Sequence, residues 1–364
     1  MPRKIPELDR LRGLAILLVL FRHSIGTVPD FAQKFARQGW VGVDLFFVLS
    51  GFLITGILWE SRDRGKYFSR FYGHRVLRIW PVYLIMLAFV FLVIPSVKLL
   101  VGGRVLEIPK DPLGLWVYLL LVQNLFANSL SASGFLRVTW SLAVEEQFYL
   151  VWPAVIRFLS RRAVLPCLLI GILLEPLIRM GAMRCGFTPV AIYENPITHG
   201  DGLLCGAAIA IWLRLAKPKR RTLLLIGITL MFAGLAIFIP RCSPDVSANY
   251  ASPFVFSGIA LASAGLLFLA LVSASTGRIL HRTFFMNRTL AFFGFISYGL
   301  YLYHFVIFRF ATSEKLIVKF DWLHDIPVTK GAMMVSGIAA SILIAWVSRI
   351  TLEKAVLSRK ALFG

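Results

Sequence analysis

The chain has 364 residues, of which 58% are hydrophobic and 16% are charged. Soluble domains carry about 25% charged residues and about 45–50% apolar ones. This composition excludes an ordinary soluble enzyme, a disordered protein and a secreted module held together by disulfides. The formal net charge of +21 would suggest nucleic-acid binding in a soluble chain. In so apolar a chain it is typical of the basic loops that membrane proteins keep in the cytoplasm, so we expect no nucleic-acid partner.

Apolar segments long enough to cross a bilayer recur from one end of the chain to the other. The first follows a basic start and has the form of a secretory signal. Arg22 and His23 interrupt it and no small-residue cleavage site follows, so we interpret it as a retained first transmembrane helix. In chain order, the candidate membrane segments are 13–28, 40–59, 76–97, 112–127, 141–159, 163–180, 197–213, 222–240, 253–273, 289–311 and 331–348.

The connecting segments alternate in their content of Lys and Arg. The basic ones are the N-terminus, 60–78, 157–162, 214–221, 278–288 and the tail from Arg349. Placing these in the cytoplasm puts both termini inside and requires 98–162 to cross the membrane once. We therefore expect an all-α polytopic membrane protein with about ten transmembrane helices, forming one domain over 1–364 with no fused soluble domain. Within 112–159, one of the segments 112–127 and 141–159 would be re-entrant or interfacial.

Titratable residues inside these segments mark candidate sites, because a charge near the bilayer centre is costly. On the expected topology they gather in the outer leaflet, whereas the Lys and Arg clusters face the cytoplasm. The outer set consists of His23, Asp44, Glu145, Glu146, His199, Asp201 and His304. This distribution predicts a polar chamber that is open to the outer side and has a second opening on the inner side, where basic residues attract anions.

Helical spacing defines several smaller groups. Arg12 and His23 are three turns apart and share a helix face, about 16 Å apart along the axis. His23 is a candidate general base, although a structural histidine bonded to a neighbouring helix would have the same position. Arg75 and Arg78 lie at i and i+3, where paired guanidinium groups suit phosphate. A plain cytoplasmic anchor would also explain that pair.

Two further groups have equally open interpretations. Glu145 stands one turn before Tyr149 and could orient a histidine or merely cap its helix. Ser297, Tyr301 and His304 form one stripe of a helix, which suits either polar helix packing or a site. The sequence contains no Walker loop, dinucleotide fingerprint, HExxH or GxSxG motif. Its four cysteines have no metal-binding spacing, so we expect no metal.

Five segments together resemble the motifs of the acyltransferase-3 family of bacterial membrane O-acyltransferases. They are Pro6–Ala15 with Arg22-His23-Ser24, Gly42–Thr55, Phe71–Pro81, Trp140–Leu150 and Ser297–His304. The resemblance implies a ten-helix enzyme of the bacterial inner membrane. Such an enzyme takes an acyl group, usually acetyl, from cytoplasmic acyl-CoA and passes it to a hydroxyl of a carbohydrate or other acceptor.

The resemblance also implies roles for individual residues. Arg12 and His23 match the family's functional pair, Arg75 and Arg78 its arginine pair, and Glu145 its glutamate. Family members often carry arginine two residues before the aspartate of the 197–213 segment. Here His199 precedes Asp201 instead, which leaves an acceptor role at that point open.

We therefore expect a multi-pass acyltransferase with acyl-CoA (acetyl-CoA) as co-substrate and no permanently bound cofactor. Its other partners would be membrane lipid and a carbohydrate or glycolipid acceptor, among them surface polysaccharide and lipopolysaccharide. His23 would remove the proton of the acceptor hydroxyl, with Asp44 or Glu145 orienting its ring. The expected catalytic residues are His23, Glu145 and Asp44, the acyl-CoA contacts Arg12, Arg75 and Arg78, and the acceptor or supporting residues Tyr301, His304 and Asp201.

Two other functions would use the same residues differently. In a proton-coupled transporter of a small polar solute, the intramembrane His, Asp and Glu would form a proton relay. Against this, no pair of interrupted helices is visible in matching halves of the chain. A non-catalytic assembly partner would tolerate alanine at His23 and Glu145 together.

Overall fold

The computed structural model describes residues 5–25, 29–96, 113–127, 134–243, 245–274, 287–311 and 330–359. Within these ranges every regular element is helical and no β-strand occurs. All of the expected loop 98–111 and most of the loops 278–288 and 313–330 lie outside the described residues. The all-helical class expected from the sequence is therefore confirmed for the part of the chain that the structure describes.

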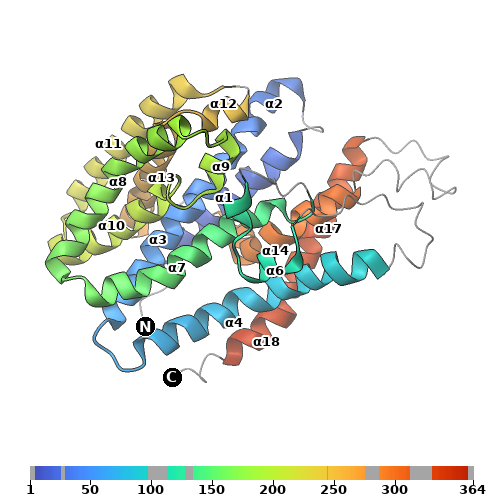
Figure 1. The fold of residues 1–364 in the computed structure, drawn as a ribbon, viewed down its shortest axis with the longest axis horizontal. Helices are drawn as coiled ribbons and strands as arrows, with labels where there is room; N and C mark the ends of the chain where they lie inside the picture. Colours follow the sequence, from blue (N-terminus) through green and yellow to red (C-terminus); the bar gives the residue numbers. More distant parts are fainter. Residues whose placement is uncertain are drawn as a thin grey trace.

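The long helices pack side by side into one bundle (Figure 1). They are α1 (Pro6–His23), α3 (Val41–Ser61), α4 (Tyr67–Ala88), α7 (Trp140–Phe158), α8 (Arg161–Arg184), α10 (Asp201–Ala216), α11 (Arg220–Phe238), α13 (Val255–Ala274), α14 (Arg288–Ala311) and α17 (Lys330–Ser348). Shorter helices connect or extend them: α2 (Asp30–Arg37), α6 (Leu115–Leu119), α9 (Pro189–Glu194), α12 (Val246–Tyr250) and α18 (Lys354–Leu357). In Figure 1, α10, α11 and α13 lie together at one end, and α4 runs beneath α7.

Seven of the described helical segments are long and apolar enough to cross a membrane. They are Asp30–Ser61, Tyr67–Ser96, Arg161–Arg184, Arg220–Arg241, Val255–Ala274, Arg288–Arg309 and Gly331–Leu357. α1 and α7 are outside this set because charged residues interrupt them, and α10 because it has only 16 residues. By its helices the chain is thus a multi-pass membrane protein, with seven candidate spans among the described residues where the sequence predicted about ten.

The outward faces of these helices are apolar, which suits lipid rather than water. On α8, for example, the side chains of Leu173 and Leu177 are 74% and 59% exposed. The interior contains polar and aromatic groups as well as aliphatic ones. Two of them, Tyr83 and Tyr118, are fully buried.

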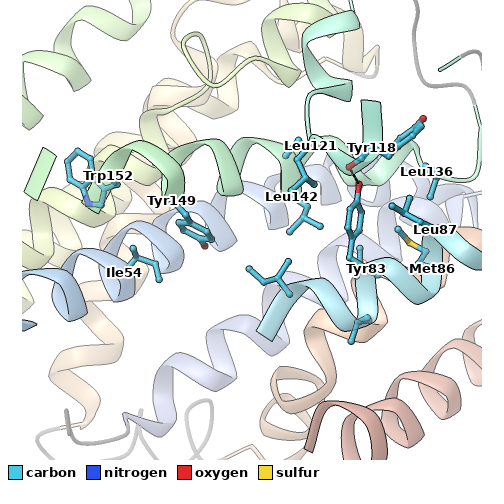
Figure 2. Packing of buried hydrophobic residues seen from close by; sticks show 14 of the residues in the cluster. Ile54, Tyr83, Met86, Leu87, Tyr118, Leu121, Leu136, Leu142, Tyr149 and Trp152 are labelled. Atoms are coloured by element: carbon cyan, nitrogen blue, oxygen red, sulfur yellow. Dashed lines mark hydrogen bonds between the residues drawn. The ribbon is translucent and has the colours of Figure 1, made fainter. Parts of the chain in front are cut away.

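The expected membrane segment 112–127 does not form a continuous helix in its described part. It begins with the five-residue helix α6 and, after Leu121 in the left-handed region (φ 55°), continues as a 3₁₀ turn over Gln123–Phe126. Figure 2 shows how α4 holds this segment: the hydroxyl of Tyr83 points at Tyr118 and donates to its carbonyl oxygen at 2.9 Å. By contrast, 141–159 corresponds to the uninterrupted helix α7.

Several helix pairs approach closely enough for backbone to touch backbone, and two of them concern the titratable residues. A Cβ atom at Gly294 on α14 would lie 1.7 Å from the carbonyl oxygen of Asp9, and one at Gly13 would lie 2.0 Å from a carbonyl oxygen of α14. α3 and α10 meet in the same way through Gly51 and Gly206. Only glycine permits such contacts, and they fix the relative positions of the helices that carry the titratable residues.

Candidate active site

A cavity of about 110 Å³ lies between α1, α3, α4, α7 and α14. Its polar lining combines cations with hydroxyl groups and one carboxyl group. The residues concerned are Arg12, Arg75, Arg78, Ser50, Ser141, Ser297, Glu145, Tyr149, Tyr298 and Tyr301. The three arginines and the glutamate that the sequence singled out, which come from three different helices, therefore meet around one space.

One arginine of the cavity retains an unused hydrogen-bond donor. The buried Nε of Arg75 has no hydrogen-bond partner among the described residues, and its guanidinium lies 5.4 Å from the ring centre of Tyr149. Arg78 follows one turn later on α4 and also lines the cavity. Arg12 pairs with Asp9 on its own helix at 3.2 Å. Guanidinium groups with free donors are suited to a bound phosphate.

Hydrogen bonds within the cavity wall hold Glu145 in place. Ser50 donates to its Oε1 at 2.7 Å and Tyr149 donates to its Oε2 at 3.3 Å. Nearby, the hydroxyl of Tyr301 donates to the carbonyl of Val138 at 2.8 Å. These bonds give the carboxylate and the tyrosine fixed orientations at the cavity.

His23 and His304 form a pair beside the cavity. His23 Nδ1 lies 3.0 Å from His304 Nε2, and His304 Nδ1 lies 3.0 Å from the carbonyl oxygen of Leu300. The ring centre of Tyr301, a lining residue, is 5.9 Å from that of His304. The sequence predicted Asp44 or Glu145 as the group that orients His23, but the structure places His304 there.

Asp44 has a different histidine as its partner. Its Oδ1 lies 2.8 Å from Nε2 of His199, whose Nδ1 lies 2.6 Å from the carbonyl oxygen of Tyr193. Both Asp44 and His199 are fully buried. Aromatic rings surround His199, namely those of Phe47, Trp140, Tyr193 and Phe256. Asp44 lies on α3 and contacts His199, which directly precedes α10. For this reason it is not the partner of His23 on α1.

Asp201 belongs to a buried ion pair that no spacing in the sequence indicated. Arg179 on α8 is fully buried, and its Nη1 lies 2.6 Å from Oδ2 of Asp201. Arg179 also donates to the carbonyl oxygen of Pro253 and to the hydroxyl of Ser257, both at 2.6 Å. The arginine that contacts Asp201 in this chain thus comes from another helix, α8. Its position inside the apolar segment 163–180 is the signal that could have identified it.

The fold and the cavity define a multi-pass membrane protein with an internal, arginine-lined site. The chain belongs to the acyltransferase-3 family, since the family's acyltransferase domain matches residues 5–350. This confirms the resemblance that the five sequence segments indicated.

Three similar proteins show how far the likeness extends. The chain is 30% identical to the peptidoglycan O-acetyltransferase OatA of Listeria monocytogenes, over 85% of this chain and 50% of that protein. It is 28% identical to the putative peptidoglycan O-acetyltransferase YrhL of Bacillus subtilis, over 86% of this chain and 50% of that protein. It is 27% identical to the O-acetyltransferase OatA of Staphylococcus aureus, over 86% of this chain and 52% of that protein. The chain thus spans about half the length of the curated relatives it matches, and no solved structure gives a significant match.

Proposed function

We propose that this protein is a membrane O-acyltransferase that transfers an acyl group, in the first instance acetyl, from cytoplasmic acyl-CoA to a hydroxyl of a cell-envelope carbohydrate. The observation that supports it most is the cavity in which Arg12, Arg75 and Arg78 meet, next to the paired His23 and His304. The names of the relatives make peptidoglycan the first acceptor to test. The proposal includes about ten spans in the bacterial inner membrane, a re-entrant segment around α6, and both termini in the cytoplasm.

In this mechanism the three arginines bind the phosphate groups of the donor. Arg12 and His23 are about 16 Å apart along α1, so a donor held by its phosphates can extend its thioester towards His23. The oxygen of the acceptor hydroxyl attacks the thioester carbonyl, a C–O bond forms and the C–S bond breaks. His23 takes the hydroxyl proton and returns it to the departing thiolate, as a general base and then a general acid.

The acidic residues have separate roles in this proposal. Glu145 is the carboxylate of the cavity, fixed by Ser50 and Tyr149. Asp44 and Asp201 are buried against His199 and against Arg179, so we assign them to supporting the walls of the site.

Thermal unfolding in lipid nanodiscs tests the donor without knowledge of the acceptor. A ligand at 100 times its dissociation constant adds about 2.7 kcal/mol to the stability of the native state, so acetyl-CoA should raise Tm. Acetyl-pantetheine, which lacks the CoA phosphates, should have no such effect. Arg75→Ala should abolish the rise. His23→Ala should keep it, because the base does not bind the phosphates.

Arg221→Ala is the matched control, since it removes one exposed arginine at the start of α11, outside the cavity. A shift lost equally in Arg221→Ala would reflect net charge rather than a phosphate site. No shift at millimolar acetyl-CoA would contradict the donor assignment. Proton-linked solute uptake by the protein reconstituted in proteoliposomes would then favour the transporter.

A further inference from the structure

His304 is held by hydrogen bonds through both ring nitrogens. It is fully buried, whereas His23 is partly exposed. On one side, Nδ1 of His304 lies 3.0 Å from the carbonyl oxygen of Leu300, one turn earlier on α14. On the other side, its Nε2 lies 3.0 Å from Nδ1 of His23.

These contacts determine where the protons are when both rings are neutral. A carbonyl oxygen can only accept, so Nδ1 of His304 must carry a hydrogen and donate it to Leu300. A neutral imidazole has one N–H, which leaves Nε2 of His304 as an acceptor. The hydrogen between the two rings therefore sits on Nδ1 of His23. Nε2 of His23 is left with a free lone pair.

The surroundings keep the His304 ring in this orientation. The rings of Phe305 and Phe308 contact the pair edge-on, at 5.2 Å from His23 and 5.5 Å from His304 between ring centres. The hydroxyl of Tyr301 already donates to Val138 and does not compete for His304. Turning the His304 ring over would break both of its hydrogen bonds.

We infer that His304 is a positioning residue, which holds His23 in the Nδ1–H tautomer and thereby leaves Nε2 as the basic nitrogen. This rests on the proposed function, in which His23 is the base. In the reaction, the hydroxyl proton goes to Nε2 of His23 as the C–O bond forms. The resulting imidazolium still donates its Nδ1–H to His304. The same Nε2 proton then passes to the thiolate when the C–S bond has broken.

Histidine tautomers are measured directly by nitrogen NMR, with no need for substrate. The full chain, labelled with ¹⁵N-histidine in lipid nanodiscs, should show His23 with a protonated Nδ1 and a bare Nε2. His23→Asn identifies the resonances that belong to His23. His304→Gln retains an acceptor oxygen and should keep this tautomer. His304→Leu leaves the backbone of Val19 as the remaining partner of the His23 ring and should raise the fraction of the Nε2–H form. A protonated Nε2 on neutral His23 in the unaltered chain would overturn the inference.

Turnover of acetyl-CoA with peptidoglycan fragments in proteoliposomes gives the second readout. His304→Leu should lower kcat by about 10²-fold or more, within the range that a general base contributes, and leave the Tm rise with acetyl-CoA unchanged. His304→Gln should retain most of the kcat of the unaltered chain. Tyr303 lies on the same helix as His304, and its hydroxyl is hydrogen-bonded to Ser348 of α17. Tyr303→Phe removes that bond and should leave kcat unchanged.

The two proposals fail in different ways. If the unaltered chain shows no acetyl-CoA turnover and no Tm rise, the proposed function is wrong, and the NMR result still decides the tautomer. If turnover is present and His304→Leu is folded and fully active, the positioning role of His304 is wrong and the acyltransferase stands.

Discussion

Arg179 is a guanidinium group buried completely among protein oxygens. It contacts the carboxylates of Asp201 and Glu175, the carbonyl of Pro253 and the hydroxyl of Ser257. A buried charge is tolerated only when it is paired and its remaining donors are bonded. This cluster ties α8 to α10 and α13, and removing its only cation would leave two carboxylates facing each other without compensation.

We therefore expect Arg179→Ala to lower the free energy of unfolding by about 3–5 kcal/mol, the usual effect of breaking a buried pair. Arg161→Ala is the matched comparison, because Arg161 pairs with Asp63 where both side chains are more than half exposed. An exposed pair contributes about 0–1 kcal/mol. Chemical unfolding in nanodiscs measures both, and equal losses would contradict the structural role given to Arg179.

Individual residues were predictable from the sequence where one helix carries the pattern. Arg75 and Arg78 were paired by their spacing, and the structure places both in the cavity. The partners of the histidines were not predictable. His23 and His304 are 281 positions apart, and Asp44 and His199 are 155 apart. Such pairs depend on which helices touch, which no local spacing reveals.

At the scale of the helices, the contact between α1 and α14 sets the distance between the two histidines. We expect Gly294→Ala to cost about 1–3 kcal/mol, as overpacking does, because its Cβ would lie 1.7 Å from the carbonyl oxygen of Asp9. Turnover of acetyl-CoA should fall as well, since the helices that carry His23 and His304 must separate. Tm and turnover of the same preparation provide the measurement.

Gly181→Ala on α8 is the control for this substitution, because its Cβ would meet nothing within 4 Å. It should leave turnover unchanged and stabilise the protein by about 0.5–1 kcal/mol, the usual gain of alanine over glycine in a helix. A Gly294→Ala protein that is as stable and active as Gly181→Ala would show that the two helices do not need to touch.

Helices were predictable from apolar length. The basic loops indicated that one of 112–127 and 141–159 does not span the membrane, but neither which one nor the break between α6 and the 3₁₀ turn was predictable. Leu121, at the break, is an apolar residue, and hydropathy counts it in favour of a span. The freed backbone groups are bonded by side chains distant in sequence: Tyr83 donates to the carbonyl of Tyr118, and Gln147 donates to that of Leu121. Non-helical backbone at membrane depth is tolerated only where protein supplies such partners.

On the scale of the whole molecule, composition alone indicated a membrane protein, whereas the number of spans was harder to obtain. Charged residues keep α1 and α7 out of the strongly apolar helices, although the sequence offered 13–28 and 141–159 as candidate membrane segments. Arg12 and Glu145 are among those charges, and both line the cavity. Some of the charges that lower the hydropathy of these two helices thus belong to the site.

The proposed topology makes a prediction about labelling from the two sides of the membrane. All four cysteines are free, and Cys185 is exposed at the end of α8. With both termini in the cytoplasm, Cys185 lies outside, so a chain in which the other three cysteines are alanine should react with an impermeant maleimide in intact spheroplasts. Arg221→Cys, in a chain without Cys185, should react only after lysis. The reverse pattern would invert the topology.

The backbone contact between α1 and α14 has a consequence for the way the protein experiences its bilayer. Membranes of different thickness make helices tilt, and helices joined only by flexible side chains would shift against each other as they do so. Because the main chains of α1 and α14 touch at Gly13 and Gly294, we expect the two helices to tilt as one body. The distance between His23 and His304 should therefore not change with lipid chain length.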